Sequence, residues 1–416
     1  MGHGIGENLA VWAGVVPVLL AVYFYPIPIP TTIPVRLPDC QRLTRSQPSR
    51  ACRSFIGIEK TTAPPTPHLS RRQNQADFDR HSHEIGDALY QAGYLAAFRS
   101  IDDTLLIALD GTDFFSLEKI SCARCSQARR KNDQVLYRHI AVAPGQTNAL
   151  PLPPEFVQPQ DGQDKQDCEL AASARWLARW GKHYRPWRIT YLGDDLYCHQ
   201  LHCLRVRAQQ ADFLLTCKPE SHATLYEWVA DFERNKVLGR VVQARRVGKK
   251  HFVDTYRYAH QVPLRNTDDA VLANWLELIT TDARGAIVFK NAWATSHAIT
   301  DHNVAAPASA GRARWKIENE NNNILKTKGY HFDHNFGHGK QFLANLFATP
   351  ILLAFLLHTA LDWMDSRYAK VRALLPSRRT FFEHLRALLQ YLPFDDWDHL
   401  MRFMLQRLAP NVPDTS

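Results

Sequence analysis

Three acidic residues stand where a folded chain can bring carboxylates together. Asp110 follows the apolar run 104–109, Asp194 follows the run 188–192, and Glu318 lies in a basic segment with helix-forming spacing. Carboxylates that end neighbouring strands can converge at one edge of an α/β sheet, although they are far apart in sequence. Mg²⁺ prefers oxygen ligands, and two such ions can activate a water or a 3′-hydroxyl and stabilise the leaving oxygen. The triad therefore predicts a metal-dependent site for phosphate-ester chemistry.

Taken singly, each of these acids is more typical of an ordinary turn or surface residue. Their order along the chain and their basic neighbours favour a common site. Asp195 competes with Asp194 for the second position. Glu320 competes with Glu318, but on a helix it points about 200° away from it.

Basic residues accompany the last acid. Arg314 lies four residues before Glu318, so both share one helix face and either form a surface ion pair or combine a metal ligand with a phosphate-binding cation. Lys326 follows Glu318 by eight residues, which on a regular helix leaves it about 80° from the starting direction.

The whole chain is basic, with 50 Lys and Arg against 41 Asp and Glu, a net charge of +9 and a pI near 9.1. This balance favours a polyanionic partner such as DNA. Four basic residues at an expected hairpin tip are candidates for phosphate contacts, although a solvated tip is a nearly equal reading. They are Arg245, Arg246, Lys249 and Lys250.

The elements that must position these residues follow from hydrophobic periodicity. Strands are expected at 104–109, 134–142, 188–192 and 213–217, with helices at 83–99, 166–180 and 196–208 between them. This alternation predicts an α/β fold, an RNase H-like mixed sheet flanked by helices. The expected units are an N-terminal extension that is poorly structured or degenerate (1–80), the first part of the core (81–221), a β-rich insertion (222–305), the last part of the core (306–365) and a helical C-terminal region (366–416).

Eight cysteines are scattered along the chain, too sparsely for a disulfide scaffold, so reduced thiols in a cytoplasmic protein are expected. Cys122 and Cys125 form a CxxC pair, which is half of a structural zinc site. Because the second half is absent nearby, ordinary reduced cysteines remain the alternative.

Two apolar stretches raise the question of a membrane. The run 9–25 is short for a span and is interrupted by Pro17, so an anchor is not expected, although it alone supports a membrane-associated alternative. The stretch 342–361 contains Asn345 and His358 and predicts a buried core helix.

The blocks around the three acids resemble DDE transposases of bacterial insertion sequences. These blocks are 109–116, 192–197 and 314–320, followed by 328–339. The last acid lies in what resembles the YREK signature: Arg314 and Glu318 match, Gly311 stands in place of the Tyr, and Lys326 comes one residue late. The family pattern of Asp, two residues and an aromatic favours Asp194, which is followed by Tyr197.

The resemblance implies an RNase H-like catalytic domain with a β-strand insertion. It implies two Mg²⁺ ions, with Mn²⁺ as a substitute, held by Asp110, Asp194 and Glu318. The implied reaction is cleavage at the terminal inverted repeats of a mobile element and strand transfer into target DNA, by a homodimer in the synaptic complex. Residues 1–75 do not look like the DNA-binding helical region expected there, so we expect an intact catalytic core with impaired recognition of the element ends. A domesticated or inactive DNA-binding relative, which keeps the basic surface without transposition, is the alternative function.

Overall fold

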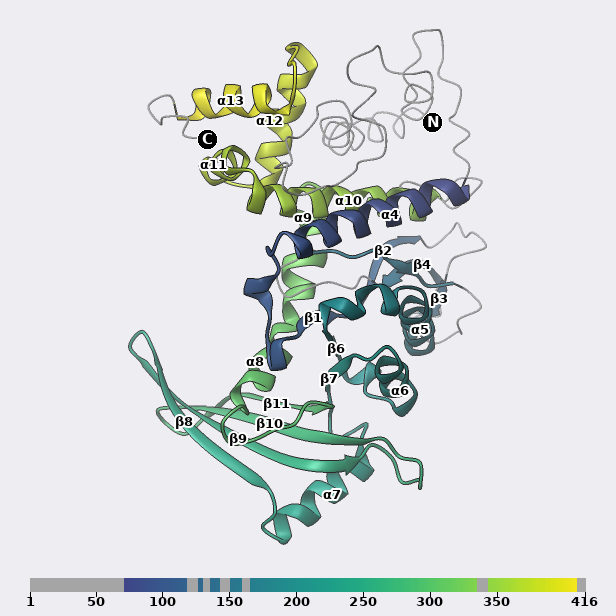
Figure 1. The fold of residues 1–416 in the computed structure, drawn as a ribbon, viewed down its shortest axis with the longest axis vertical. Helices are drawn as coiled ribbons and strands as arrows, with labels where there is room; N and C mark the ends of the chain where they lie inside the picture. The colour runs from purple at the N-terminus through teal and green to yellow at the C-terminus, as the bar shows by residue number, and fades with distance from the viewer. Residues whose placement is uncertain are drawn as a thin grey trace.

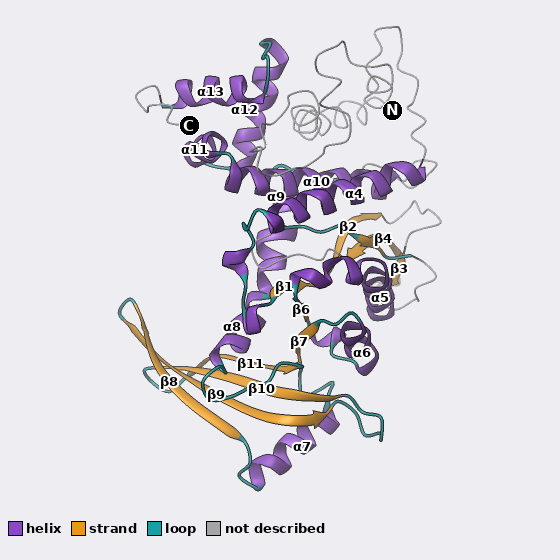
Figure 2. Cartoon of the chain, in the orientation of Figure 1, coloured by secondary structure: helices purple, strands orange, loops and turns teal. Residues whose placement is uncertain are grey.

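The computed structural model describes residues 71–117, 126–129, 135–142, 150–158, 165–334 and 343–409. It confirms a mixed α/β fold, in which helices flank a mixed sheet (Figures 1 and 2). The finer expectation of an RNase H-like arrangement is taken up below. The extension expected over 1–80 lies mostly outside the described residues, and the first described helix, α4, spans Arg71–Gln91.

A seven-stranded sheet has the order β1-β6-β7-β11-β10-β9-β8. Strands β1 (Leu105–Ala108), β6 (Ile189–Gly193) and β7 (Asp212–Thr216) are parallel, and they occupy the expected positions. All residues of β1 and β6 are buried, as is typical of parallel strands covered on both faces.

Helices cover both faces of these parallel strands. Leu105 and Ile107 share a core with α5 (Lys165–Tyr184) and α6 (Gln200–Ala208), whereas Leu106 and Ala108 share a core with α8 (Ala305–Ala313). In Figure 1, α5 and α6 lie to the right of the strands and α8 lies to the left. The alternation of side chains along β1 therefore fixes which helices lie on which face.

The region expected to be a β-rich insertion supplies the other four strands of the same sheet. They are β8 (Gly239–Val247), β9 (Lys250–Pro263), β10 (Leu272–Asp282) and β11 (Ile287–Thr295). Strand β11 pairs with β7 in antiparallel register, with Trp293 opposite Thr216. The insertion thus continues the core sheet. It opens with a helix that the sequence did not lead us to expect, α7 (Ala223–Arg234).

A second sheet begins directly after Asp110. Strand β2 (Gly111–Leu117) pairs with β4 (Val135–Val142), and β4 also pairs with β3 (Ser126–Arg129) and β5 (Glu155–Phe156). Only β4 was expected from the sequence. Because β1 belongs to one sheet and β2 to the other, Asp110 stands at the junction between the two sheets.

The helical segment after α8 is irregular. Residues Ile317–Asn322 form a π-helix, followed by the short helix α9 (Asn323–Thr327). The π-turn replaces the regular α-helix expected around Glu318. Such turns occur mostly as single turns inside α-helices and are frequent at functional sites.

The C-terminal region is helical, as expected. Helices α11 (Ser366–Leu374), α12 (Arg378–Tyr391) and α13 (Trp397–Leu408) enclose an apolar core with α10 (Leu343–Met364). One described helical window, 347–364 within α10, is long and apolar enough to cross a membrane, but 72% of it is buried inside the protein. This burial agrees with the core helix expected there. The run 9–25 lies outside the described residues.

Candidate active site

Parallel pairing carries the first two acids to the same edge of the sheet. Ala108 is the register partner of Leu192, and the Leu109 amide donates a 2.8 Å hydrogen bond to the Leu192 carbonyl. Asp110 and Asp194 are the next acids beyond these paired residues, and both side chains are half-buried. The convergence expected from the strand pattern therefore follows from the pairing of β1 with β6.

The helical segment beyond α8 brings the third acid to this edge. Arg314 Nη1 lies 3.3 Å from Glu318 Oε1, and the Arg314 side chain is the less exposed of the pair. The charges of both residues act on Asp110, so Glu318 takes part in the ion pair with Arg314 and also acts on the first acid. Arg314 is thus the cation nearest to this group of carboxylates that the structure identifies.

The environment of Asp110 is unusual for a carboxyl group. Burial raises the pKa of Asp110 to about 7, and the negative charges of Glu318, Glu169 and Asp194 act in the same direction, whereas Arg314 opposes them. Like charges oppose one another's ionisation, and burial disfavours any charged form. A raised pKa in a group of converging acids is a physical marker of a functional site, because a divalent cation relieves both penalties.

Glu169 is a fourth acid that sequence reasoning missed. It lies on α5, is 4% exposed, and its carboxyl carbon is 2.3 Å from where a side chain at position 111 would place its Cβ. Gly111 therefore leaves the space that the Glu169 carboxyl fills. A signal was present in the sequence, because Glu169 shares the buried helix face with Ala172 and Trp176, three and seven residues later.

The structure separates the two competing aspartates. The Asp194 carboxylate accepts a 3.0 Å hydrogen bond from the Leu196 amide, and its charge acts on Asp110. Asp195 turns to other partners: it accepts a 2.7 Å bond from the Lys218 amide, and its Oδ1 lies 3.2 Å from Nε2 of His222. This geometry favours Asp194 as the member of the acidic group.

Comparisons with known proteins leave the family open. No protein-family model matches the chain, and no curated protein matches it either. The chemistry of the site therefore has to be inferred from its residues.

The acids are neighbours, but they do not form a closed cluster. Among the described residues, the group of three ligands whose atoms all lie within 4.8 Å of one another is Cys198, Cys217 and His222, not the carboxylates. Repulsion between carboxylates resists a closer approach when no cation is present. The arrangement is thus an open acidic edge with one arginine in it.

Position 311 has no room for a side chain larger than that of glycine. A Cβ at position 311 would lie 2.5 Å from the Trp293 indole, which is 1% exposed. A side chain at position 311 would overlap the indole ring. The buried tryptophan on β11 therefore excludes any larger residue on this turn of α8. Both Trp293 and Trp275 are buried core residues.

The basic residues of the β8–β9 hairpin differ in their availability. Arg245 is engaged: its Nε lies 2.5 Å from Asp254 and its guanidinium stacks over Phe252. Arg246 donates a 2.8 Å bond to the Gly248 carbonyl, while Lys249 and Lys250 are exposed at the turn. Lys326 lies half-buried on α9, and Cys122 and Cys125 are outside the described residues.

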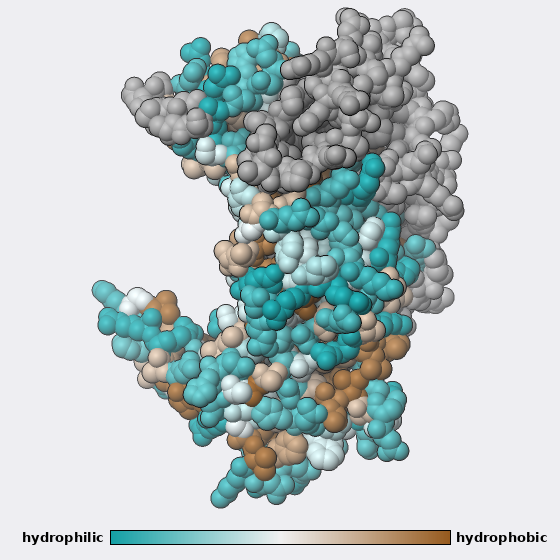
Figure 3. Space-filling model, viewed as in Figure 1, coloured by the Kyte–Doolittle hydropathy of each residue, from teal (hydrophilic) through white to brown (hydrophobic). Residues whose placement is uncertain are grey.

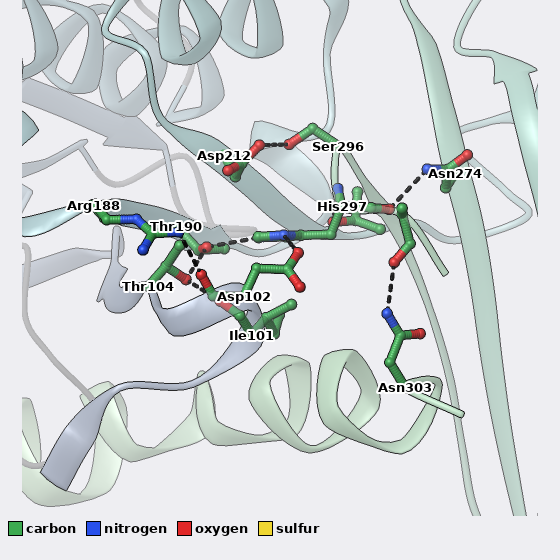
Figure 4. Close-up of polar contacts among 12 residues, drawn as sticks. Ile101, Asp102, Thr104, Arg188, Thr190, Asp212, Asn274, Ser296, His297 and Asn303 are labelled. Atoms are coloured by element: carbon green, nitrogen blue, oxygen red, sulfur yellow. Dashed lines mark hydrogen bonds and ion pairs between the residues drawn. The ribbon is translucent and has the colours of Figure 1, made fainter. Parts of the chain in front are cut away.

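A second polar constellation has the form of a catalytic triad. His297 Nδ1 lies 2.7 Å from Asp102, and its Nε2 lies 2.7 Å from the Thr190 hydroxyl, which is 2.6 Å from that of Thr104 (Figure 4). The Thr190 side chain is 0% exposed. A hydroxyl that no substrate can reach is not a nucleophile, so this network is structural.

Proposed function

We propose that the chain is a DDE-type DNA transposase that cleaves the ends of an insertion sequence and joins them to target DNA. The observation that supports this most directly is the half-buried Asp110, whose pKa is raised to about 7 among Asp194, Glu318 and Glu169. The proposal includes the RNase H-like core, because acids after adjacent parallel strands and a third acid on a late helix are the arrangement implied by the resemblance.

The donor set suits a hard divalent cation. Asp110, Asp194 and Glu318 would hold Mg²⁺, since all three offer carboxylate oxygens and none of them is a soft ligand. When bound, the ions supply an activated water or 3′-hydroxyl and stabilise the leaving oxygen. The half-buried Asp110 gains most from a cation, because its charge is the most costly to leave uncompensated.

Glu169 and Arg314 are positioning residues in this proposal. Glu169 lies against Gly111 and keeps negative charge behind Asp110. Arg314 holds Glu318 through their ion pair in the absence of a cation. Because its guanidinium is always charged and can bind phosphate in a bidentate manner, it also suits the DNA backbone.

The π-turn affects the direction in which Lys326 points relative to Glu318. A π-helix closes its hydrogen bonds over one more residue than an α-helix, so a single π-turn accommodates one additional residue. The π-helix Ile317–Asn322 contains Glu318 and ends before Lys326, which comes one residue late in the signature. We infer that the π-turn absorbs this one additional residue. Lys326 then points in the direction that the signature requires and can serve as a second phosphate contact.

The shape of the molecule offers a path for DNA. Figure 3 shows a wide concave side between the β8–β9 hairpin and the C-terminal helices, and in Figure 1 the segment from α8 to α9 runs along it. Lys249 and Lys250 lie at the hairpin turn. The proposed partners are the terminal inverted repeats and target DNA, bound by a homodimer in the synaptic complex, in the cytoplasm.

The test is Mg²⁺-dependent nicking and strand transfer with a labelled element end. We expect the variants Asp110→Ala, Asp194→Ala and Glu318→Ala to lose both reactions while they still bind DNA. Glu320→Gln is the matched control, since it removes a carboxylate from the same π-turn and should retain activity. Unchanged nicking in all three alanine variants would refute the proposal.

A DNA-binding relative without catalysis is the second candidate. The observation that favours it is the open spacing of the acids, which are not gathered like the described thiol and imidazole ligands. It predicts that the wild-type chain binds DNA but nicks it with neither Mg²⁺ nor Mn²⁺. The same assay therefore decides between the two candidates.

A further inference from the structure

Three metal-ligand side chains meet on the far side of the Asp194–Asp195 turn. The ligand atoms of Cys198, Cys217 and His222 all lie within 4.8 Å of one another, and Cys198 is in hydrogen-bond contact with both of the others. The two cysteines are each 1% exposed and His222 is 5% exposed. The group is therefore enclosed.

The ligands come from three separate pieces of backbone. Cys198 ends the short 3-10 turn Asp195–Tyr197, Cys217 follows β7, and His222 occupies the position before α7. Cys217 is held in place because its amide donates a 2.9 Å bond to Ala292 and its carbonyl accepts a 2.8 Å bond from Tyr226. Convergence of fixed elements distinguishes the group from a chance meeting of surface side chains.

The chemistry of the donors selects the metal. Two thiolates and one imidazole are borderline-soft ligands, which suit Zn²⁺ and do not suit Mg²⁺. Zinc prefers four ligands in a tetrahedron. Asp195 lies 3.2 Å from His222 Nε2 and is the nearest described carboxylate to offer the fourth, or to orient His222 while a water completes the site.

We propose that Cys198, Cys217 and His222 bind a structural Zn²⁺ ion beside the candidate active site. The ion links the turn after β6, which carries Asp194, to the end of β7 and to the start of α7. It cross-links these elements where the chain passes from the parallel strands into the β8–β11 region. None of these three ligands belongs to the Cys122–Cys125 pair, and the proposed site does not depend on the proposed transposase activity.

The first experiment measures zinc in the full-length protein purified without chelators. We expect one zinc ion per chain, and after replacement by Co²⁺ we expect the visible absorption of tetrahedral cobalt with a thiolate charge-transfer band. Both signals should disappear in Cys217→Val, which keeps an apolar side chain of similar size. Cys217→His offers a different ligand and should retain the metal with an altered cobalt spectrum, which separates loss of a ligand from loss of folding.

Two controls locate the ion. Cys203→Ser changes a buried cysteine nearby that is outside the ligand group, and Cys122→Ser with Cys125→Ser removes the CxxC pair. Both should keep the full zinc content. Asp195→Asn should weaken zinc binding by about 10- to 100-fold, the usual effect of a residue that orients or completes a site.

Three outcomes would overturn the proposal. They are zinc content unchanged in Cys217→Val, zinc lost only with the CxxC pair, and a Cys198–Cys217 disulfide in the freshly isolated protein. None of these measurements requires DNA cleavage. The zinc site and the transposase proposal can therefore fail independently.

Discussion

At the scale of single residues, burial and charge conflict at Asp110. Its pKa is raised from 3.8 to about 7 by burial and by Glu318, Glu169 and Asp194. The folded state thus holds the Asp110 proton more tightly than the unfolded state does. As pH rises from about 4 to about 7, Asp110 ionises in the unfolded chain but keeps its proton in the folded protein, so the free energy of unfolding decreases. Above about pH 7 the group is ionised in both states, and the free energy of unfolding falls no further on its account.

We therefore expect Asp110→Asn to stabilise the metal-free protein at pH 8 by an amount of the order of a few kcal/mol, and to have little effect at pH 4. Urea unfolding in EDTA across this range measures the difference between variant and wild type. Asp268→Asn, at an exposed position, is the control. A difference between Asp110→Asn and wild type that does not depend on pH would contradict the assignment.

Gly311 gives a second prediction at this scale. Gly to Ala in a helix ordinarily stabilises by about 0.5–1 kcal/mol. Here the added methyl meets the Trp293 indole at 2.5 Å, so we expect Gly311→Ala to destabilise by about 1–3 kcal/mol instead. Thermal unfolding measures the sign.

The control for this prediction is Ser309→Ala, an exposed change on the same helix. Trp293→Phe removes part of the indole and should reduce the penalty of Gly311→Ala in the double variant. Equal penalties in the two backgrounds would show that the indole is not the obstacle.

At the scale of elements, strand positions could be predicted well and the geometry between elements could not. The runs before Asp110 and Asp194 predict strands because they are short, mostly apolar or β-branched and end at turn residues, and β1 and β6 confirm this. By contrast, the π-turn at Glu318 depends on how the segment packs between α8 and α9, which periodicity does not record. Glu169 was missed for a related reason: its place on the apolar helix face indicates burial, but only the fold shows that Gly111 makes room for its carboxyl group beside Asp110.

The hydrogen-bond network around His297 connects three elements of the fold. It joins the 3-10 turn Ile101–Asp103 to β6 and to the segment after β11. Thr190→Val keeps the shape of the side chain but leaves His297 Nε2 without its hydroxyl partner. We expect a loss of about 1–3 kcal/mol in the free energy of unfolding, the cost of leaving a buried polar group unsatisfied.

Thr281→Val on β10 is the matched control, since Thr281 makes only a 3.5 Å contact with the Val253 carbonyl. Denaturant unfolding of the two variants checks the prediction. If both lose the same small amount, the His297 network does not stabilise the fold.

At the scale of the whole molecule, charge and shape together predict how DNA is bound. Net charge favoured a polyanion, and the sequence predicted a basic hairpin tip. The fold adds that Lys249 and Lys250 are exposed at the turn, whereas Arg245 is paired with Asp254. We expect the double variant Lys249→Glu, Lys250→Glu to weaken DNA binding for all sequences alike. The slope of log affinity against log salt should fall by about 2.

Gel-shift titrations at several salt concentrations provide this slope. The control is Lys236→Glu, an exposed lysine just after α7. A loss confined to one DNA sequence would show that the hairpin reads bases. An unchanged slope would place the DNA elsewhere.

The pairing of β11 with β7 has a consequence for any attempt to shorten the chain. The sequence suggested that residues 222–305 are an insertion, which invites their removal. In the fold they protect the edge of β7, whose unpaired amides and carbonyls would otherwise be open to another chain. A deletion of 222–305 should therefore yield a protein that associates through this edge and aggregates, rather than a smaller soluble core.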